Sequence, residues 1–372
     1  MKCDLTVSEL FQAYYDCRKN KRNTWNALRF EERLERNLMQ LYRELEAGEY
    51  TPGRSICFVI TAPRCREVWA ADFRDRIVHH AFYNRYSDYF YRRFIHDSYA
   101  CIPGKGALKA ADRATHFMHS VTCNFSRPAW VLKADFANFF NSINKNTLDA
   151  ILTKHIHDPW WLDLTRKILH NDPRKNVFVK SSRKLLRKVP EHKSLLRSKE
   201  HLGLPIGNLS SQFFANIYLN GLDQLAKHAL KLKYYIRYVD DVLMFGAAPQ
   251  ELYAKYAALD SYADENLDVR FHPQKTHLNR VEKGFDFVGY CIRPYARYLR
   301  RSVLHNMRRK TEMITDPEDM RATVNSYFGM LRHTKSFRQR KKASAALSRQ
   351  GYCFDQHLTK LVLRGERQCT FA

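Results

Sequence analysis

Two adjacent carboxylates, Asp240 and Asp241, lie between the apolar runs KYYIR and VLMFG. Such runs with a polar break predict strands near 234–238 and 242–246, joined by a tight turn. Neighbouring acids repel each other, and buried carboxylates are costly unless a cation compensates them. A salt bridge could supply that cation, and divalent metals do so better. The tetrapeptide YVDD is weak evidence alone, because such short matches arise by chance.

A third carboxylate, Asp135, ends the apolar run that opens VLKADFANFFNSIN at 131–144. If this strand end lies beside the turn, three acids converge, as two-metal phosphoryl transfer requires. One ion lowers the pKa of an attacking 3′-hydroxyl, and the other neutralises the leaving pyrophosphate. Mg²⁺ suits an oxygen-only site. The acids therefore predict nucleotidyl transfer with two Mg²⁺ ions, for which Mn²⁺ is a substitute.

The charge of the chain indicates a polyanionic partner. Its 63 Lys and Arg residues face 38 acids, a formal net charge of +25, and such an excess is typical of nucleic-acid binding. Residues 172–200 carry a net +7 and predict an insertion or extended loop, while residues 296–349 carry a net +10 on helical patterns. Either segment alone could be a solvated face. Together they favour a nucleic-acid track.

Several other classes of protein fit the sequence poorly. The chain has no apolar run of about eighteen residues, which a membrane span needs, and its start lacks the apolar core of a secretory signal. Its nine cysteines form no C-x-x-C pair, which favours a reduced, cytoplasmic protein. We expect neither a membrane partner nor a structural metal.

The apolar patterns predict mixed helices and strands. Leucines 34, 38, 41 and 45 share one face of a helical region over 5–47. Further strands are expected near 56–60, 129–135 and 285–292, and further helices near 72–94, 144–170 and 209–230. Because helices and strands do not alternate regularly, the order favours an α+β fold over a doubly wound sheet.

The stretch GLPIGNLSSQFFANIYLNGLD at 203–223 offers glycines before a helix. Gly203 and Gly207 would let the backbone approach a substrate closely. The alternative is a glycine-bounded loop that leads into an ordinary helix.

Taken in order, these segments resemble the motifs of reverse transcriptases. The fingers motifs match PRCREVWAADFRDRIVHH (63–80) and SYACIPGKGALKAADR (98–113); motifs A, B and C match VLKADFANFF, GLPIGNLSSQFFAN and YVDD; motif D and the primer grip match HPQKT (272–276) and GFDFVGYCIRP (284–294). GLPIGNLSSQ and the N-terminal NTWNALRFEERLERNL resemble prokaryotic enzymes, namely those of diversity-generating retroelements and of phage defence.

The resemblance implies a right-hand polymerase with fingers, an antiparallel palm and a helical thumb. The expected segments are an N-terminal helical extension (1–54), fingers with part of the palm (55–130), a palm with a basic insertion at about 172–202 (131–295), and a basic helical thumb (296–372).

The resemblance also implies a role for particular residues. Asp135 and Asp240 would bind both metals, with Asp241 as the third acid and Phe136 as a neighbouring ligand, while Lys275 would protonate pyrophosphate; a solvated lysine is the alternative. The expected dNTP contacts are Arg66, Arg74, Phe136, Phe140, Ile206, Gly207 and Gln212, and the expected nucleic-acid contacts are Tyr238, Gly289, Tyr290, Arg308, Arg309 and Lys310. Phe140 would exclude a 2′-hydroxyl, unless it is simply a core aromatic.

Ile206 departs from the commonest pattern. Many reverse transcriptases carry Gln before the motif B glycine, whereas Ile206 resembles the mutagenic retroelement enzymes. An apolar side chain cannot make the hydrogen bond that Gln makes to the incoming nucleotide and template base. High fidelity is therefore not expected from this motif.

The function expected from these motifs is an RNA-directed DNA polymerase. It would use dNTPs to copy a structured non-coding RNA into cDNA. We favour anti-phage defence over a diversity-generating retroelement because of the 172–200 insertion, an argument from association only. A non-catalytic, maturase-like RNA-binding protein is the rival, and the intact acids oppose it. An accessory protein or a second copy of the chain stays open as a partner.

Overall fold

The computed structural model describes residues 2–19, 24–61 and 64–362. The chain divides into two compact units: unit 1 comprises Met1–Gly106, Ala134–Val242 and Tyr253–Thr276, and unit 2 comprises Ala107–Lys133, Leu243–Leu252 and His277–Ala372. Both are discontinuous in sequence, so neither coincides with a segment expected above, and that division remains a prediction. No helix within the described ranges is long and apolar enough to cross a membrane.

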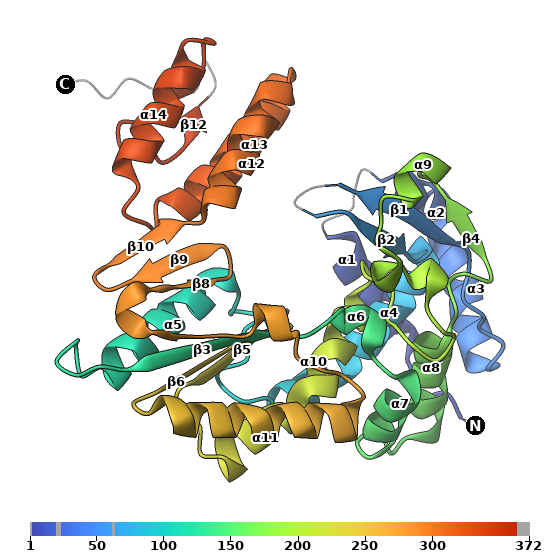
Figure 1. Ribbon diagram of the computed structural model, residues 1–372. Helices are drawn as coiled ribbons and strands as arrows, with labels where there is room; N and C mark the ends of the chain where they lie inside the picture. The colour runs from blue at the N-terminus through green and yellow to red at the C-terminus, as the bar shows by residue number, and fades with distance from the viewer. Residues whose placement is uncertain (1, 20–23, 62–63, 363–372) are drawn as a thin grey trace. The chain divides into compact units, whose positions relative to one another are not determined.

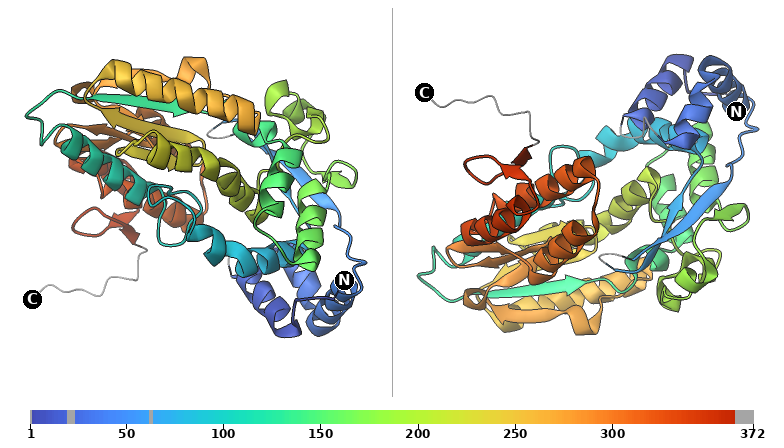
Figure 2. Two further views of the ribbon diagram at one scale, coloured as in Figure 1. Left: turned by 90° about the horizontal axis from the view of Figure 1, so that it is seen from below. Right: turned by 90° about the horizontal axis from the view of Figure 1, so that it is seen from above.

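Helices gather at the N-terminal end of unit 1 (Figures 1 and 2). They are α1 (Val7–Arg18), α2 (Trp25–Glu31), α3 (Leu34–Glu46) and α4 (Phe73–Tyr91). The helix α1 begins at a capping box in which Thr6 and Glu9 satisfy each other's backbone N–H groups. In α3 the expected leucine face is buried at positions 38, 41 and 45, which confirms the helical prediction for this region.

The second feature of unit 1 is a three-stranded sheet of order β2-β1-β4. β1 (Ser55–Ile60) pairs antiparallel with β2 (Arg66–Ala70) and parallel with β4 (Val177–Val179). β4 and the short helix α9 (Arg183–Leu186) lie within 172–200. The prediction of an extended loop was therefore wrong for part of this segment, because a tertiary partner, β1, supplies the hydrogen bonds that make β4 a strand.

Strands β5 (Tyr235–Tyr238), β6 (Asp241–Gly246), β3 (Trp130–Asp135) and β7 (His277–Arg280) form a four-stranded sheet in that order. The first three confirm the predicted strands to within two residues. β3 and β6 each contribute residues to both units, so Asp135 and Asp241, at their unit 1 ends, belong to unit 1. The two acids of the turn and the acid at the strand end are thus parts of one compact body.

Further helices complete this region: α6 (Phe139–Ser142), α7 (Lys145–Thr153), α8 (Pro159–His170), α10 (Leu209–Gln224) and α11 (Pro249–Leu267). The predicted helix 144–170 is two helices, because Asp158 caps the backbone N–H of Trp161 and Pro159 starts the second helix. The predicted helix 209–230 ends in a single π-helical turn, Leu225–Ala229.

Unit 2 contains α5 (Ala107–Val121), the antiparallel sheet β8 (Phe285–Phe287), β9 (Tyr290–Arg293) and β10 (Ala296–Leu299), and the helices α12 (Arg301–Met313), α13 (Pro317–Leu331) and α14 (Phe337–Ser348), followed by β11 (Cys353–Phe354) and β12 (Leu361–Val362). The strand predicted at 285–292 is two strands, because Val288 and Gly289 take positive φ angles of 42° and 88° and reverse the chain. Three helices confirm the helical patterns after residue 300. Residues 296–299 instead extend the sheet.

Candidate active site

The turn between β5 and β6 carries the two adjacent acids. Val239 has a φ of 55°, a left-handed conformation that β-branched residues adopt at a cost of about 1–3 kcal/mol. The guanidinium Nη1 of Arg237 donates a hydrogen bond of 2.9 Å to the carbonyl oxygen of Val239. This bond stabilises the strained turn. It therefore fixes the position of the backbone from which the side chains of Asp240 and Asp241 project.

The end of β3 lies against this turn. The backbone N–H of Phe136 donates to the carbonyl oxygen of Asp240 at 3.4 Å, and His272 N donates to Asp135 O at 2.8 Å. The ring of Phe136 is buried and stacks on Phe271 at 4.1 Å between ring centroids. The structure therefore places Asp135 between the turn and the segment 270–275, and its position beside the turn is the one that the sequence predicted. Because the ring of Phe136 is buried, only the backbone of this residue could serve as a metal ligand.

The carboxylates of this cluster disturb one another. Burial, the largest cause, and the negative charges of Asp135 and Asp241 together raise the pKa of Asp240 to about 7. A bound cation would reverse this effect, because it favours the ionised form. Oxygen donors of this kind suit Mg²⁺. The cluster therefore has the chemistry of a divalent-metal site.

The carboxylates do not, however, form a ready-made cage. Among residues 2–19, 24–61 and 64–362, no three His, Cys, Asp or Glu side chains are already gathered as a metal-binding group. Asp135 is instead paired with the ammonium group of Lys275, which follows the short 3₁₀ turn Pro273–Lys275. The side chain of Lys275 thus lies against one of the three acids; its expected role as a proton donor stays a prediction.

The glycine-rich loop lies beside motif A. Leu204 N donates to Phe140 O at 2.8 Å, and Trp69 N donates to Ile206 O at 2.7 Å. Gly207 has a φ of 125°, and a Cβ there would lie 2.7 Å from Trp69 O. Glycine is needed at this position because any side chain would strike β2.

The side chains expected to contact dNTP differ in their surroundings. Phe140, Ile206 and Arg66 are half-buried, and Gln212 is exposed and accepts a hydrogen bond from Cys101 Sγ at 3.4 Å. Arg74 pairs with Glu44 on α3, and its guanidinium lies 5.4 Å from the ring centroid of Tyr50. Arg74 is thus engaged by the N-terminal helices, an arrangement that the sequence pattern did not reveal.

A buried ion pair lies below the turn, and sequence reasoning missed it. Arg237 and Asp223 are both 0% exposed. Arg237 Nε and Nη2 donate to the two carboxylate oxygens of Asp223 at 2.9 and 2.7 Å, and Tyr235 OH donates to the same carboxylate at 2.8 Å. A charged residue inside each of two apolar runs, YYIRYV and NIYLNGLD, was the available signal.

This pair also joins three of the sequence motifs. Arg237 Nη1 donates to Asn216 Oδ1 at 3.1 Å, and Asn216 Nδ2 donates to Ala100 O at 2.9 Å. Arg237 Nη2 donates to Ser98 Oγ at 3.3 Å. The fingers segment at 98–100, the motif B helix α10 and the motif C turn therefore share one hydrogen-bonded network.

The residues expected to contact nucleic acid lie in both units. Tyr238, at the end of β5, is half-buried in unit 1. In unit 2, Gly289 forms the turn after β8, while Tyr290 is buried beneath the guanidinium of Arg297, 5.4 Å from its ring centroid. Three cations of α12 are exposed: Arg308, Arg309 and Lys310.

Comparisons with known proteins agree with this geometry. The family model described as reverse transcriptase (RNA-dependent DNA polymerase) matches residues 64–292, more than half of the chain. Protein YkfC of Escherichia coli is 24% identical over 73% of this chain and 76% of its own length.

Two solved telomerase structures also resemble the chain. Apo telomerase of Candida tropicalis has a TM-score of 0.52 at 11% identity, over 81% of this chain and 60% of that one. Telomerase of Candida albicans in complex with a telomeric RNA fragment has a TM-score of 0.45 at 11% identity, over 80% and 55% of the two chains. This chain spans less than two thirds of those proteins, and the first of them supports the fold alone.

Proposed function

This chain belongs to the reverse transcriptase (RNA-dependent DNA polymerase) family, and we propose that it copies a dedicated structured RNA into cDNA for prokaryotic anti-phage defence. The observation that carries the enzymatic part is the position of Asp135 beside the Asp240–Asp241 turn, within one compact unit. A scaffold protein would gain nothing from three carboxylates whose burial and mutual repulsion raise the pKa of Asp240.

The carboxylates of Asp135, Asp240 and Asp241, with the backbone carbonyl of Phe136, would hold two Mg²⁺ ions. When bound, such ions activate a primer 3′-hydroxyl and offset the charge of the leaving pyrophosphate. The chain itself contributes the position of its acids: the strained Val239 turn orients Asp240, and the end of β3 presents Asp135.

Lys275 is the acid that this site would use. Its ammonium group, held against Asp135, would give a proton from Nζ to an oxygen of the departing pyrophosphate. A positioned general acid of this kind contributes typically 10²–10⁴-fold to a rate. Phe140, half-buried and tied through its carbonyl to the motif B loop, would limit the space for a 2′-hydroxyl.

The enzymatic proposal is tested by incorporation of dNTPs on an RNA template annealed to a DNA primer. We expect extension that requires Mg²⁺ or Mn²⁺ and is lost with a chelator. RNA binding without any extension on primed RNA would favour the maturase-like alternative. Extension on primed DNA but not on primed RNA would contradict the template preference.

The proposed cellular role has one competitor. Ile206 at the motif B position resembles the mutagenic retroelement enzymes and favours error-prone copying in a diversity-generating retroelement. The RNA and DNA that copurify with the protein distinguish the two roles. cDNA of one non-coding RNA supports defence, whereas cDNA of a variable coding repeat with scattered substitutions supports the retroelement.

A further inference from the structure

Residues 172–202, called here the basic segment, are held firmly against the fingers sheet. Glu67 on β2 is 3% exposed and accepts hydrogen bonds from the hydroxyl of Ser194 and from the backbone N–H groups of Leu195 and Leu196, the latter two at 2.8 and 3.4 Å. Leu195 also packs on Cys57 and Trp69. A buried carboxylate is retained only when it is so satisfied, and Glu67 therefore anchors the segment.

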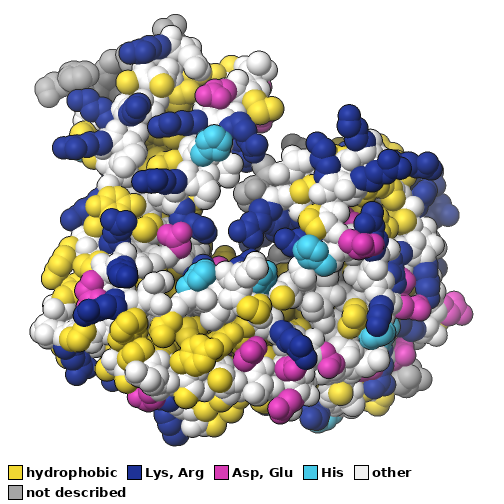
Figure 3. All heavy atoms as spheres, in the orientation of Figure 1, with side chains coloured by type: hydrophobic (Ala, Val, Ile, Leu, Met, Phe, Trp, Pro, Cys, Tyr) yellow, Lys and Arg dark blue, Asp and Glu magenta, His cyan; other side chains and the backbone are white. Residues whose placement is uncertain are grey.

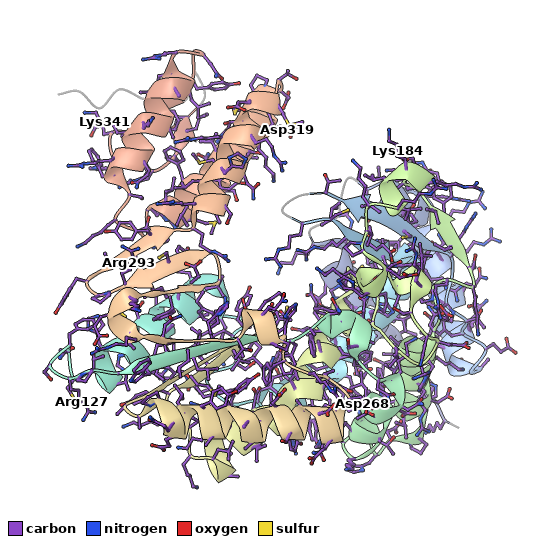
Figure 4. All side chains as sticks on the ribbon, viewed as in Figure 1. Arg127, Lys184, Asp268, Arg293, Asp319 and Lys341 are labelled. Carbon is purple, nitrogen blue, oxygen red and sulfur yellow. The ribbon has the colours of Figure 1, made fainter. Side chains whose placement is uncertain are left out.

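The other side of the basic segment consists mainly of cations. The run 173–190 contains seven Lys and Arg and no acid. Five of these lie exposed on and around α9 without an acidic partner in the described part of the chain: Lys180, Arg183, Lys184, Arg187 and Lys188. Dark blue side chains crowd this face of unit 1 in Figure 3, and Lys184 points away from the sheet in Figure 4.

The spacing of these cations costs the segment free energy. Arg183 and Arg187 are four residues apart, as are Lys184 and Lys188. Like charges at this spacing in or beside a helix destabilise it by about 0.2–0.5 kcal/mol a pair. A solvated loop would have no need to bear this cost. A polyanion that lies across the segment would remove it.

An aromatic side chain stands at the edge of the same surface. Phe178 on the edge strand β4 is 49% exposed, and the guanidinium of Arg54 lies 5.5 Å from its ring centroid. An exposed ring beside cations can stack an unpaired base while the cations contact phosphates. Membrane-binding surfaces instead use long amphipathic helices, and α9 has only four residues.

We propose that the basic segment is a docking surface for structured RNA. The cations of α9 contact phosphates of a helical stem, and Phe178 stacks a base of an adjacent loop. This proposal rests on the function proposed above and names the surface that selects the RNA. The surface is separate in sequence from the acids that would carry out synthesis.

The experiment uses the full-length protein and a stem-loop RNA without a primer. Binding is measured over a series of salt concentrations for wild type and for Arg183→Gln/Lys184→Gln/Arg187→Gln. The matched control is Arg33→Gln/Arg36→Gln/Arg43→Gln, which removes three exposed cations of the α3 region and gives the same net charge. The plot of log K against log salt has a negative slope, and each lost phosphate contact reduces the magnitude of that slope by about 0.7–0.9.

We expect the magnitude of this slope to decrease by about two to three in the α9 variant and to change little in the α3 control. We also expect Phe178→Ala, but not Val179→Ala, to weaken binding of the looped RNA by roughly five- to a hundredfold. Equal slopes for the two triple variants would overturn the proposal. So would an equally large loss by the α9 variant on anionic vesicles or polyglutamate, because the surface would then attract any polyanion.

Primer extension separates this proposal from the polymerase assignment. At saturating primed template the α9 variant should extend at the wild-type rate, because none of its three residues contacts the acids. A wild-type protein that cannot extend a primer, yet shows the selective change in slope, would remove the polymerase function and leave the docking surface. Normal primer extension with unchanged salt slopes would support the polymerase function and rule out the docking surface.

Discussion

Two charged clusters meet at the turn between β5 and β6, and they differ in charge balance. In the buried cluster one cation, Arg237, matches one anion, Asp223, and both are 0% exposed. In the other cluster three acids, Asp135, Asp240 and Asp241, lie together, and Lys275 pairs with Asp135. The balanced cluster needs nothing further, and its satisfied hydrogen bonds fix the turn. In the unbalanced cluster the carboxylates still repel one another, and added cations would relieve that repulsion, which indicates where the ligand belongs.

The largest expected effect comes from removing charge at the unbalanced cluster. Asp240→Asn/Asp241→Asn should abolish nucleotide incorporation, because the metal ions lose their ligands. The same change should leave the protein folded and at least as stable in a chelator, because repulsion is relieved. Single-turnover primer extension and thermal unfolding measure the two effects. Incorporation at the wild-type rate by this double variant would contradict the assignment of the site.

Removing a charge from the buried cluster should lower the stability of the protein, in contrast to the acid cluster. Arg237→Met leaves the carboxylate of Asp223 buried and unpaired, so the free energy of unfolding should fall by about 3–5 kcal/mol. Arg237→Met/Asp223→Leu removes both charges and should recover most of that loss.

The recovered double variant should still polymerise about 10–100-fold more slowly, or need more Mg²⁺, because the Val239 carbonyl has lost its donor. Urea unfolding and the Mg²⁺ concentration at half-maximal rate are the measurements. Full activity in a stable double variant would show that the pair supports the fold and does not position the acids.

The acid cluster should also make the stability of the protein depend on pH, through the raised pKa of Asp240. The pKa of Asp240 is about 7 in the folded protein, against 3.8 for an ordinary Asp, so the folded state binds the extra proton between these values. Without divalent ions, the stability that Asp240 contributes is therefore highest below about pH 4 and falls as pH rises through 7.

Asp240→Asn should remove this fall, which we expect to be on the order of a few kcal/mol. Urea unfolding of both forms in a chelator, followed through the pH range, gives the comparison. Mg²⁺ should restore the stability of the wild type above pH 7 and have little effect on the variant. Parallel curves for the two proteins would mean that Asp240 titrates normally.

The smallest effect is expected at a residue outside both clusters. Ile206 lies in the motif B loop and is tied to β2 through its carbonyl. Its side chain offers no hydrogen bond to a base pair, so Ile206→Gln should lower misincorporation by about two- to tenfold. Stability and Mg²⁺ dependence should not change. Deep sequencing of cDNA made on one defined RNA compares the forms, and identical error spectra would show that Ile206 only packs.

The sequence by itself determined the local structure and the identity of the acids. Apolar runs of four to six residues around YVDD are enough to define a hairpin, and the run before Asp135 is enough to define a strand that ends at the acid. These features depend on near neighbours in the chain, and for that reason they can be predicted without coordinates. The order of the motifs then identified the family.

Only the tertiary structure decided which distant charges pair. Arg237 could have met any acid, and Asp223, fourteen residues earlier in the chain, is its partner because both are sealed in the core between α10 and β5. Arg74 pairs with Glu44, and Glu67 holds the basic segment, for the same reason. An ion pair depends on distance and burial in three dimensions, and spacing along the sequence does not encode either.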